Sequence, residues 1–479
     1  MLMIAAILLP AVLGIVISAV PAADRTRKIL YALSVVLTDI TAILAAMGNE
    51  AVQLGELSEG VGIVFRADTL GRCFLAVTIL LYTAVLFYSF EYMKMEERIP
   101  SFYAFFLISM AALIAECFAG NLVTMYLSFE FLTLTSMPLV LHERTREAVA
   151  AGLKYLFYSV AGAMMGLLAI FFIYHFAADP GLFVYGGFLD PAKYSGAENI
   201  LYAAVLAGIV GFGAKAGMYP MHGWLPTAHP IAPAPASALL SGIIAKAGIV
   251  AVIRLVYYCV GADLIRETWV QTAWMCLAML TVLMGSTMAF REKIVKKRLA
   301  YSTISQISYI MLALSLLTED GLRGGLMQLI SHMSAKGCLF LCAGVFIVVL
   351  DAHRVEELKG IGKRLPVTMW CFMIAALSLV GIPPMGGFVS KWKIAAAALT
   401  GAPGIFTVLA PVVLLISALL TAGYLFPVVV DAFFPGKDFE GEGTFAEPGI
   451  LMDGAMIALC ITALLAGLFG AGIVGGMVL

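Results

Sequence analysis

The sequence predicts an all-α integral membrane protein. Of its 479 residues, 62% are hydrophobic and only 12% are charged, whereas soluble domains carry about 25% charged residues. Apolar stretches of about 20 residues, the length that a helix needs to cross the hydrocarbon core, recur about 14 times along the chain. These stretches are expected to be helices, because lipid cannot satisfy the backbone hydrogen bonds of an open strand or coil.

The predicted spans follow one another along almost the whole chain. They cover residues 2–20, 29–48, 72–93, 102–119, 121–141, 151–176, 200–218, 236–259, 268–290, 299–317, 321–350, 367–399, 406–430 and 450–475. Between the second and third spans, residues 61–65 form a short apolar run flanked by turn residues. This run predicts a hairpin outside the membrane.

The seventh span is irregular. Lys215 stands where hydrocarbon is expected, and Pro220, His222 and His229 follow inside what would otherwise be one helix. A helix that breaks at membrane depth exposes backbone groups, which must then line a cavity enclosed by protein. An ionisable residue beside such a break is a candidate ion site.

The twelfth span is broken in a similar way. Pro383 and Pro384 interrupt it, and Lys391 follows the interruption. The lysine therefore lies before the break in the seventh span and after it in the twelfth, as an inverted repeat would give. The alternative is that the two breaks resemble each other by chance.

The basic residues predict the orientation. Loops after odd-numbered spans contain 17 Lys and Arg residues by our count, against 5 after even-numbered spans. The larger group comprises Arg25, Arg27, Lys28, Lys94, Arg98, Arg144, Arg146, Arg291, Lys293, Lys296, Lys297, Arg298, Arg354, Lys359, Lys363, Arg364 and Lys437. The positive-inside rule places this group in the cytoplasm and both termini outside.

The other seven basic residues lie within spans. Three of them, Lys154, Arg254 and Lys393, are near span ends, where a long side chain can extend to the interface. The remaining four are central: Lys215, Lys246, Lys336 and Lys391. A lysine at the centre of a membrane helix costs about 2.5–3.5 kcal/mol on insertion scales. Four such residues on four spans are difficult to explain as anchors.

Acidic residues within spans are fewer. Glu130 lies in the middle of the fifth span, Glu116 near the outer end of the fourth and Asp39 midway along the second. A carboxylate close to a buried lysine keeps that lysine charged, and a lysine without it releases its proton more easily. We therefore expect Glu130 and Lys215 to form a switch, within ion-pair or one-water reach.

The tenth and eleventh spans are unusually polar. Residues 301–309 carry several hydroxyls, and His332 and Lys336 are four residues apart, hence on one helical face. Titratable groups and hydroxyls spaced through a membrane suit proton transfer through water. The alternative is ordinary hydrogen bonding between helices, which is common for Ser and Thr in membranes.

The sequence offers no sign of redox or nucleotide chemistry in this chain. The eight cysteines are scattered without a CxxC pair, the net charge is -1, and neither a Walker motif nor a dinucleotide fingerprint occurs. We therefore expect no cofactor, no metal site, no catalytic residue and no nucleic-acid partner. The first span could pass for a signal peptide, but it lacks a basic start and a clear cleavage site.

Five motifs together resemble the antiporter-like subunits of respiratory complex I, of multisubunit cation/proton (Mrp-type) antiporters and of membrane-bound energy-converting hydrogenases. They occupy residues 220–226, 232–242 followed by Lys246, 298–306, 332–340 and 381–391, and the resemblance extends over about residues 60–430. It implies fourteen helices with two inverted five-helix repeats, each containing a broken helix. The implied division is 1–100 (helices 1–3 and the outer hairpin), 101–260 (first repeat), 261–430 (second repeat) and 431–479 (helix 14).

The resemblance also implies a central hydrophilic axis. Its proton-translocating positions correspond here to Glu130, Lys215, Lys246, His332, Lys336 and Lys391, with Lys391 facing the outer exit. We expect supporting roles for Lys154, Pro220, His222, His229, Pro383 and Pro384. The chain ends soon after the fourteenth span, whereas the distal complex I relative carries a long lateral helix, so it resembles the shorter, internal subunits.

The leading hypothesis is a subunit that translocates protons, or sodium ions and protons, in the cell membrane within a redox-driven complex. Its expected partners are other membrane subunits and a redox module with iron–sulfur clusters. The second hypothesis is a subunit of a Na⁺/H⁺ antiporter powered by ion gradients alone. A solute transporter and an inert spacer are less consistent with buried charge that is spread over many spans and mostly cationic.

Overall fold

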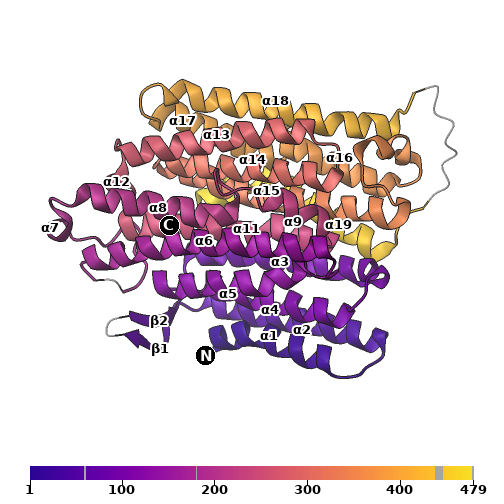
Figure 1. Cartoon of the computed structure of the whole chain (residues 1–479), viewed down its shortest axis with the longest axis horizontal. Coiled ribbons are helices and arrows are strands. Elements are labelled where there is room, and N and C mark those ends of the chain that lie inside the picture. The colour runs from indigo at the N-terminus through magenta and orange to yellow at the C-terminus, as the bar shows by residue number, and fades with distance from the viewer. Residues whose placement is uncertain (59–60, 180, 437–445, 477–479) are drawn as a thin grey trace.

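The computed structural model describes residues 1–58, 61–179, 181–436 and 446–476, so Lys437 of the predicted inner loops lies outside the described residues. The structure is a bundle of helices that run side by side along the long axis of the molecule (Figure 1). Within the described residues, twelve helices are long and apolar enough to cross a membrane. The predicted all-α membrane fold is confirmed.

The helices have the following bounds. In the first half they are α1 (Leu2–Ala19), α2 (Asp24–Met47), α3 (Thr69–Tyr92), α4 (Ile99–Cys117), α5 (Leu122–Val140), α6 (Arg146–Phe176), α7 (Pro191–Tyr194), α8 (Glu198–Ala216), α9 (Leu225–Ile231), α10 (Ala234–Leu239) and α11 (Ala245–Ile253). In the second half they are α12 (Ala262–Ile265), α13 (Trp269–Arg291), α14 (Val295–Ser315), α15 (Glu319–Leu350), α16 (Pro366–Val380), α17 (Gly386–Gly401), α18 (Phe406–Phe433) and α19 (Ile450–Gly475).

Two further predicted spans correspond to helices outside these twelve. The first is α14, whose first turn is rich in Lys and Arg, and the second is the broken pair α16 and α17. The seventh predicted span is also broken, because α8 ends at Ala216 and the chain resumes as the short helix α9. The eighth span contains two π-helical segments, η2 (Leu240–Ile244) and η3 (Arg254–Val260), which the sequence pattern did not reveal.

The predicted hairpin between the second and third spans is present. Strands β1 (Val52–Ser58) and β2 (Val61–Phe65) pair antiparallel, with Val52 opposite Phe65. The hairpin contacts the start of α5, where the Asn121 amide donates to the carbonyl of Gly62 (2.8 Å) and the Thr124 hydroxyl accepts from the amide of Val64 (2.8 Å). Asn121 also caps α5 by accepting from the Thr124 amide, so one side chain fixes both elements.

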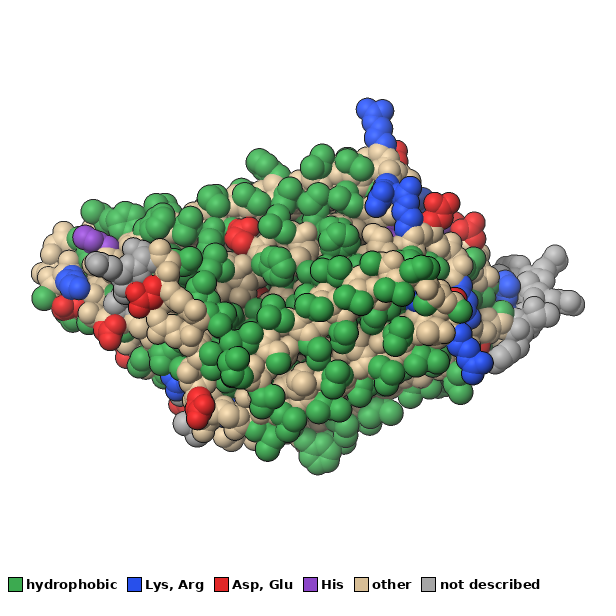
Figure 2. Space-filling view, turned by 90° about the horizontal axis from the view of Figure 1, so that it is seen from below, with side chains coloured by type: hydrophobic (Ala, Val, Ile, Leu, Met, Phe, Trp, Pro, Cys, Tyr) green, Lys and Arg blue, Asp and Glu red, His purple; other side chains and the backbone are tan. Residues whose placement is uncertain are grey.

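The surface is that of a membrane protein. Figure 2 shows apolar side chains over the middle of one face, with Lys and Arg side chains gathered mainly at the end opposite the hairpin. In Figure 1, α1 begins and α19 ends toward the end that carries the hairpin. This arrangement agrees with an even number of crossings and with basic loops on one side.

Candidate functional site

The first break brings Lys215 to α5. Its side chain is fully buried, and its amine donates to the Thr133 hydroxyl (2.7 Å) and the Phe129 carbonyl (3.2 Å) while lying 4.3 Å from the centre of the Phe129 ring. The helix α8 can end directly after Lys215 because Gly217 adopts the left-handed conformation (φ 80°). The lysine is therefore held by hydroxyl, carbonyl and ring rather than by a carboxylate.

Glu130 lies on the same turn of α5. Its side chain is half-buried, and its Oε1 has no hydrogen-bond partner among the described residues. Lys215 instead uses the acceptors of Phe129 and Thr133, which flank Glu130 in sequence. The sequence predicts either an ion pair or contact through one water. Among the described residues the Lys215 amine donates to Phe129 and Thr133 rather than to Glu130, and contact through one water stays a prediction.

A second carboxylate near Lys215 was missing from the predicted site. Glu116 on α4 is 1% exposed, neither of its oxygens has a partner in the described part of the chain, and it interacts electrostatically with Lys215 and Arg254. The sequence signal was an acidic residue inside an apolar span. Its distance from the centre of that span made it look peripheral, whereas helix packing buries it completely.

Lys246 is positioned by a π-helical segment. It follows η2, is fully buried, and donates to the carbonyl of Ser241 (2.7 Å), while the Ser241 hydroxyl bonds the Thr303 hydroxyl on α14 (2.7 Å). A π-helical segment alters the hydrogen-bond spacing and so leaves a carbonyl available for a side chain; such segments are frequent at functional sites.

His332 and Lys336 lie on α15, and both are fully buried. Lys336 donates to the carbonyl of Leu299 (3.0 Å), whereas neither ring nitrogen of His332 has a partner among the described residues. His332 lies within electrostatic range of Lys246, Lys336 and Lys391.

His229 and Lys296 lie beyond the first break. His229 is fully buried, stacks on the Phe340 ring with centroids 4.6 Å apart, and has no ring nitrogen bonded within the described residues. Lys296, which the sequence placed in a loop, is only 5% exposed and donates to the carbonyls of Ala232 (2.6 Å) and Pro230 (3.3 Å). It is a cap for the carbonyls at the end of α9, which is a correction to the loop assignment.

The second break holds Lys391. Its amine donates to the carbonyls of Leu379 and Val380 (3.0 Å to the latter) at the end of α16, and it lies 5.1 Å from the centre of the Tyr309 ring. The two half-helices approach closely here, since a Cβ added to Gly387 would lie 1.8 Å from the Ser378 carbonyl oxygen. Lys391 therefore caps the carboxyl end of α16.

A hydrogen-bonded polar chain starts beside Lys391. Ser390 donates to Gln328 (2.5 Å), Gln328 to Gln306 (3.1 Å), and Gln306 to the Thr421 hydroxyl (3.4 Å) on α18. Other hydroxyls of the polar stretch 301–309 also bond to α18: Ser302 to Tyr424 and Ser305 to Ser417. For these hydroxyls the structure favours helix–helix hydrogen bonding.

The predicted supporting residues surround the breaks. Lys154 is exposed, and its amine donates to the Thr227 hydroxyl (2.9 Å), while His222 is half-buried against the Tyr219 ring (5.7 Å between centroids). Pro220 lies in the linker between α8 and α9, and Pro383 and Pro384 lie in the linker between α16 and α17.

Arg254 does not extend to the interface as the sequence suggested. It is 1% exposed, forms a two-bond ion pair with Asp68, and lies between the rings of Phe183 (4.6 Å) and Tyr258 (4.7 Å). Asp68 in turn caps α3 by accepting from the Gly71 amide (2.9 Å). The pair joins the start of α3 to the π-helical end of the eighth span.

The titratable residues do not converge as metal ligands. Within the described residues, no group of three or more His, Cys, Asp or Glu side chains could hold a metal ion. Instead, the lysines and histidines are spaced from one helix to the next, and each lysine donates to at least one backbone carbonyl.

Comparisons with known proteins agree with this geometry. Residues 119–419 match the family described as "NADH:quinone oxidoreductase/Mrp antiporter, TM". The N subunit of the NADH-quinone oxidoreductase of Desulforudis audaxviator is 32% identical over 79% of this chain and 74% of its own length. Hydrogenase-4 component B of Escherichia coli is 32% identical over 70% of this chain and 51% of its own length. A Na⁺/H⁺ antiporter subunit of Bacillus subtilis is 29% identical over 82% of this chain and 78% of its own length.

Solved structures have the same fold. A chain of the Mrp complex from Dietzia sp. DQ12-45-1b superposes with a TM-score of 0.84 over 99% of this chain and 96% of that chain, at 22% identity. A chain of an archaeal membrane-bound sulfane sulfur reductase gives a TM-score of 0.83, also at 22% identity. The family match spans more than half of the sequence. This chain therefore belongs to the antiporter-like membrane subunits shared by complex I, hydrogenase and Mrp complexes.

Proposed function

We propose that this chain translocates protons, or exchanges sodium ions and protons, as a membrane subunit of a redox-driven complex related to complex I or membrane-bound hydrogenase. The proposal rests on the series of buried lysines and histidines from Lys215 through Lys246, Lys336 and His332 to Lys391. A buried lysine releases its proton when desolvated and regains it when water or a carboxylate approaches. Each member can therefore hold a proton for a limited time and pass it along.

Two carboxylates are proposed to control the charge of Lys215 at the first break. Glu130 and Glu116 both act electrostatically on Lys215, while the hydrogen bonds of Lys215 go to Thr133 and Phe129. A shift of α5 that brings Glu130 closer would hold the lysine charged, and a shift away would favour the release of its proton toward Lys246. The redox energy for such shifts comes from partner subunits, including a module with iron–sulfur clusters.

The proposed organisation follows the predicted boundaries. Residues 1–100 form the N-terminal helices and outer hairpin, 101–260 and 261–430 the two inverted repeats, and 431–479 the last helix. The protein lies in the cell membrane with both termini outside, because its basic loops then face the cytoplasm. Proton exchange with the outside is assigned to Lys391, next to the opened backbone of the second break.

A second candidate function is that of one subunit in a Na⁺/H⁺ antiporter powered by ion gradients alone. It is favoured by the B. subtilis relative, which is named as part of such an antiporter. Purifying the complex with its subunits separates the two functions, because only a redox-driven complex brings electron-transfer subunits with it. Recovery of small antiporter subunits without a redox module would support the second function.

The transport test uses the whole complex in sealed vesicles. Lys246→Ala removes a fully buried amine from the middle of the series and is expected to abolish ion translocation while leaving the complex assembled. Lys359→Ala, on an exposed loop residue, is the matched control and should transport normally. Full translocation by the assembled Lys246→Ala complex would exclude a relay through this lysine.

A further inference from the structure

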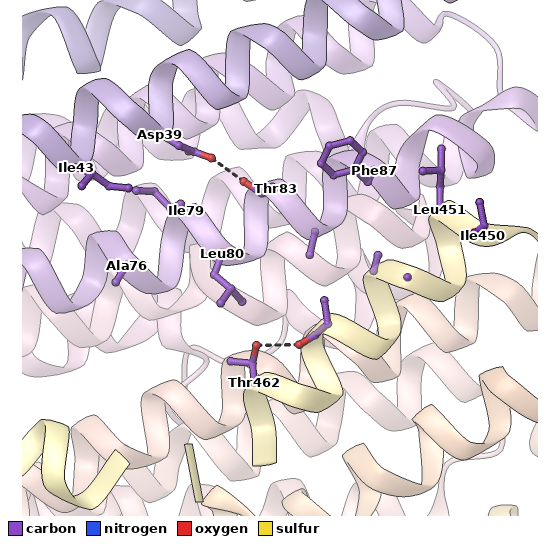
Figure 3. Close-up of a pocket in the computed structure, with 14 residues that line it drawn as sticks. Asp39, Ile43, Ala76, Ile79, Leu80, Thr83, Phe87, Ile450, Leu451 and Thr462 are labelled. Carbon is purple, nitrogen blue, oxygen red and sulfur yellow. Dashed lines mark hydrogen bonds between the residues drawn. The ribbon is translucent and has the colours of Figure 1, made fainter. Parts of the chain in front are cut away.

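A groove lies between α2, α3 and α19 (Figure 3), and none of the buried lysines lines it. Its volume is about 780 Å³, and its walls are apolar apart from Asp39, Thr83 and Thr462. The groove opens toward the bilayer, since the large apolar residues at its rim, such as Ile43 and Ile450, are exposed in this chain. It is too large to be filled by a single neighbouring side chain.

Asp39 is an acidic group in this apolar groove. One of its oxygens accepts from the Thr83 hydroxyl on α3 (2.8 Å), and the other is buried without a partner among the described residues. Asp39 is the sixteenth residue of the 24-residue helix α2, about 22 Å from its start at 1.5 Å per residue. The carboxyl group therefore lies inside the hydrocarbon layer, where a charged side chain requires a partner.

Small residues form the floor of the groove. Gly454, Ala458 and Thr462 follow one another at four-residue intervals along α19, and all three line the groove. A Cβ added to Gly454 would meet no atom within 4 Å. Small residues at this spacing on one helical face allow the backbone of another helix to approach closely.

We propose that this groove receives a transmembrane helix of a partner subunit and that this helix presents a Lys or Arg side chain to Asp39. The acyl chain of a lipid could pack against the apolar walls of the groove, but the amine of a phospholipid stays at headgroup depth. At the depth of Asp39 a lipid offers only hydrocarbon, whereas a protein side chain can bring a cation there. The floor of small residues also fits a helix better than a disordered acyl chain.

The first test measures assembly of the intact complex. Asp39→Leu and Asp39→Asn both remove the negative charge and are expected to lower the amount of one co-purifying membrane subunit at least tenfold on native gels. Asp39→Glu keeps the charge and should retain the subunit. Thr41→Val is the matched control on the same helix, because Thr41 does not line the groove and its hydroxyl already donates to the Leu37 carbonyl (2.9 Å).

The second test identifies the occupant. A cysteine introduced by Ile43→Cys at the groove rim, reacted with a photo-activated thiol crosslinker in native membranes, should yield a crosslinked peptide from a membrane span containing Lys or Arg. Exchanging charges, with Asp39→Lys and an acidic residue at that partner position, should restore assembly. Lipid adducts alone, a crosslinked span without a basic residue, or full assembly of Asp39→Leu would each overturn the proposal.

These measurements do not depend on ion transport, because they use membranes without a gradient. A complex that assembles through Asp39 but does not move protons would leave this interface intact and contradict only the proposed function. Conversely, normal proton translocation by an Asp39→Leu complex that keeps all its subunits would contradict only the interface.

Discussion

The Lys215 amine donates a 2.7 Å hydrogen bond to the Thr133 hydroxyl. Thr133 lies three residues after Glu130 on α5, so a lysine from the first broken helix contacts the turn that carries the acidic residue without pairing with it. In the proposed switch, a movement of α5 would replace this neutral acceptor of the Lys215 amine by the charged Glu130.

Glu130→Gln tests the acidic residue of this site. The amide keeps the size of the side chain but cannot stabilise a charged Lys215, so translocation in reconstituted vesicles should fall at least tenfold while assembly on native gels is unchanged. Glu147→Gln, at an exposed position in the first turn of α6, serves as the control. Normal coupled translocation by Glu130→Gln would remove the switch.

Thr133→Val tests the hydrogen bond itself. Valine has the same shape but leaves the buried amine with one acceptor fewer, and hydrogen bonds to charged groups are worth about 1.5–3 kcal/mol. We expect a lower thermal stability in this variant, measured by the loss of the monodisperse complex on heating. In a Lys215→Met background the same substitution should have little effect, and equal losses in the two backgrounds would show that the bond does not contribute.

Arg254 and Asp68 are expected to be coupled in stability. Removing one partner, as in Asp68→Leu, leaves a buried guanidinium without its carboxylate and should destabilise the protein by about 3 kcal/mol. The double variant Asp68→Leu with Arg254→Leu should recover part of that loss, because neither charge remains. A double-mutant cycle on the melting temperature measures the coupling, and additive losses would argue against the pair.

Lys391 has two possible roles, which substitution can separate. Lys391→Ala removes both the titratable amine and the cap on the Leu379 and Val380 carbonyls, so both translocation and stability should decrease. Lys391→Arg keeps charge and donors but does not deprotonate in the useful range. We expect this variant to be stable yet defective in ion translocation, as measured in vesicles. Full translocation with arginine would make Lys391 a structural cap only.

Much of this protein could be predicted from the sequence alone. Apolar run length gives the crossings, and prolines with neighbouring lysines give the breaks at residues 217–224 and 381–385. Even the hairpin of β1 and β2 is visible as a short apolar run between turns. These features are local, since they depend on the cost of unsatisfied backbone in lipid and on the fixed conformation of proline.

The tertiary structure decided which polar groups meet. Lys296 looks like a loop residue and Glu116 like a peripheral one, yet both are buried where helices from distant parts of the chain pack over them. Glu130 and Lys215 were expected to lie within ion-pair or one-water reach, and the side-chain acceptor that packing places against the lysine is Thr133. Burial and hydrogen-bond partners depend on the rotation and depth of each helix against its neighbours, which span length and charge alone do not specify.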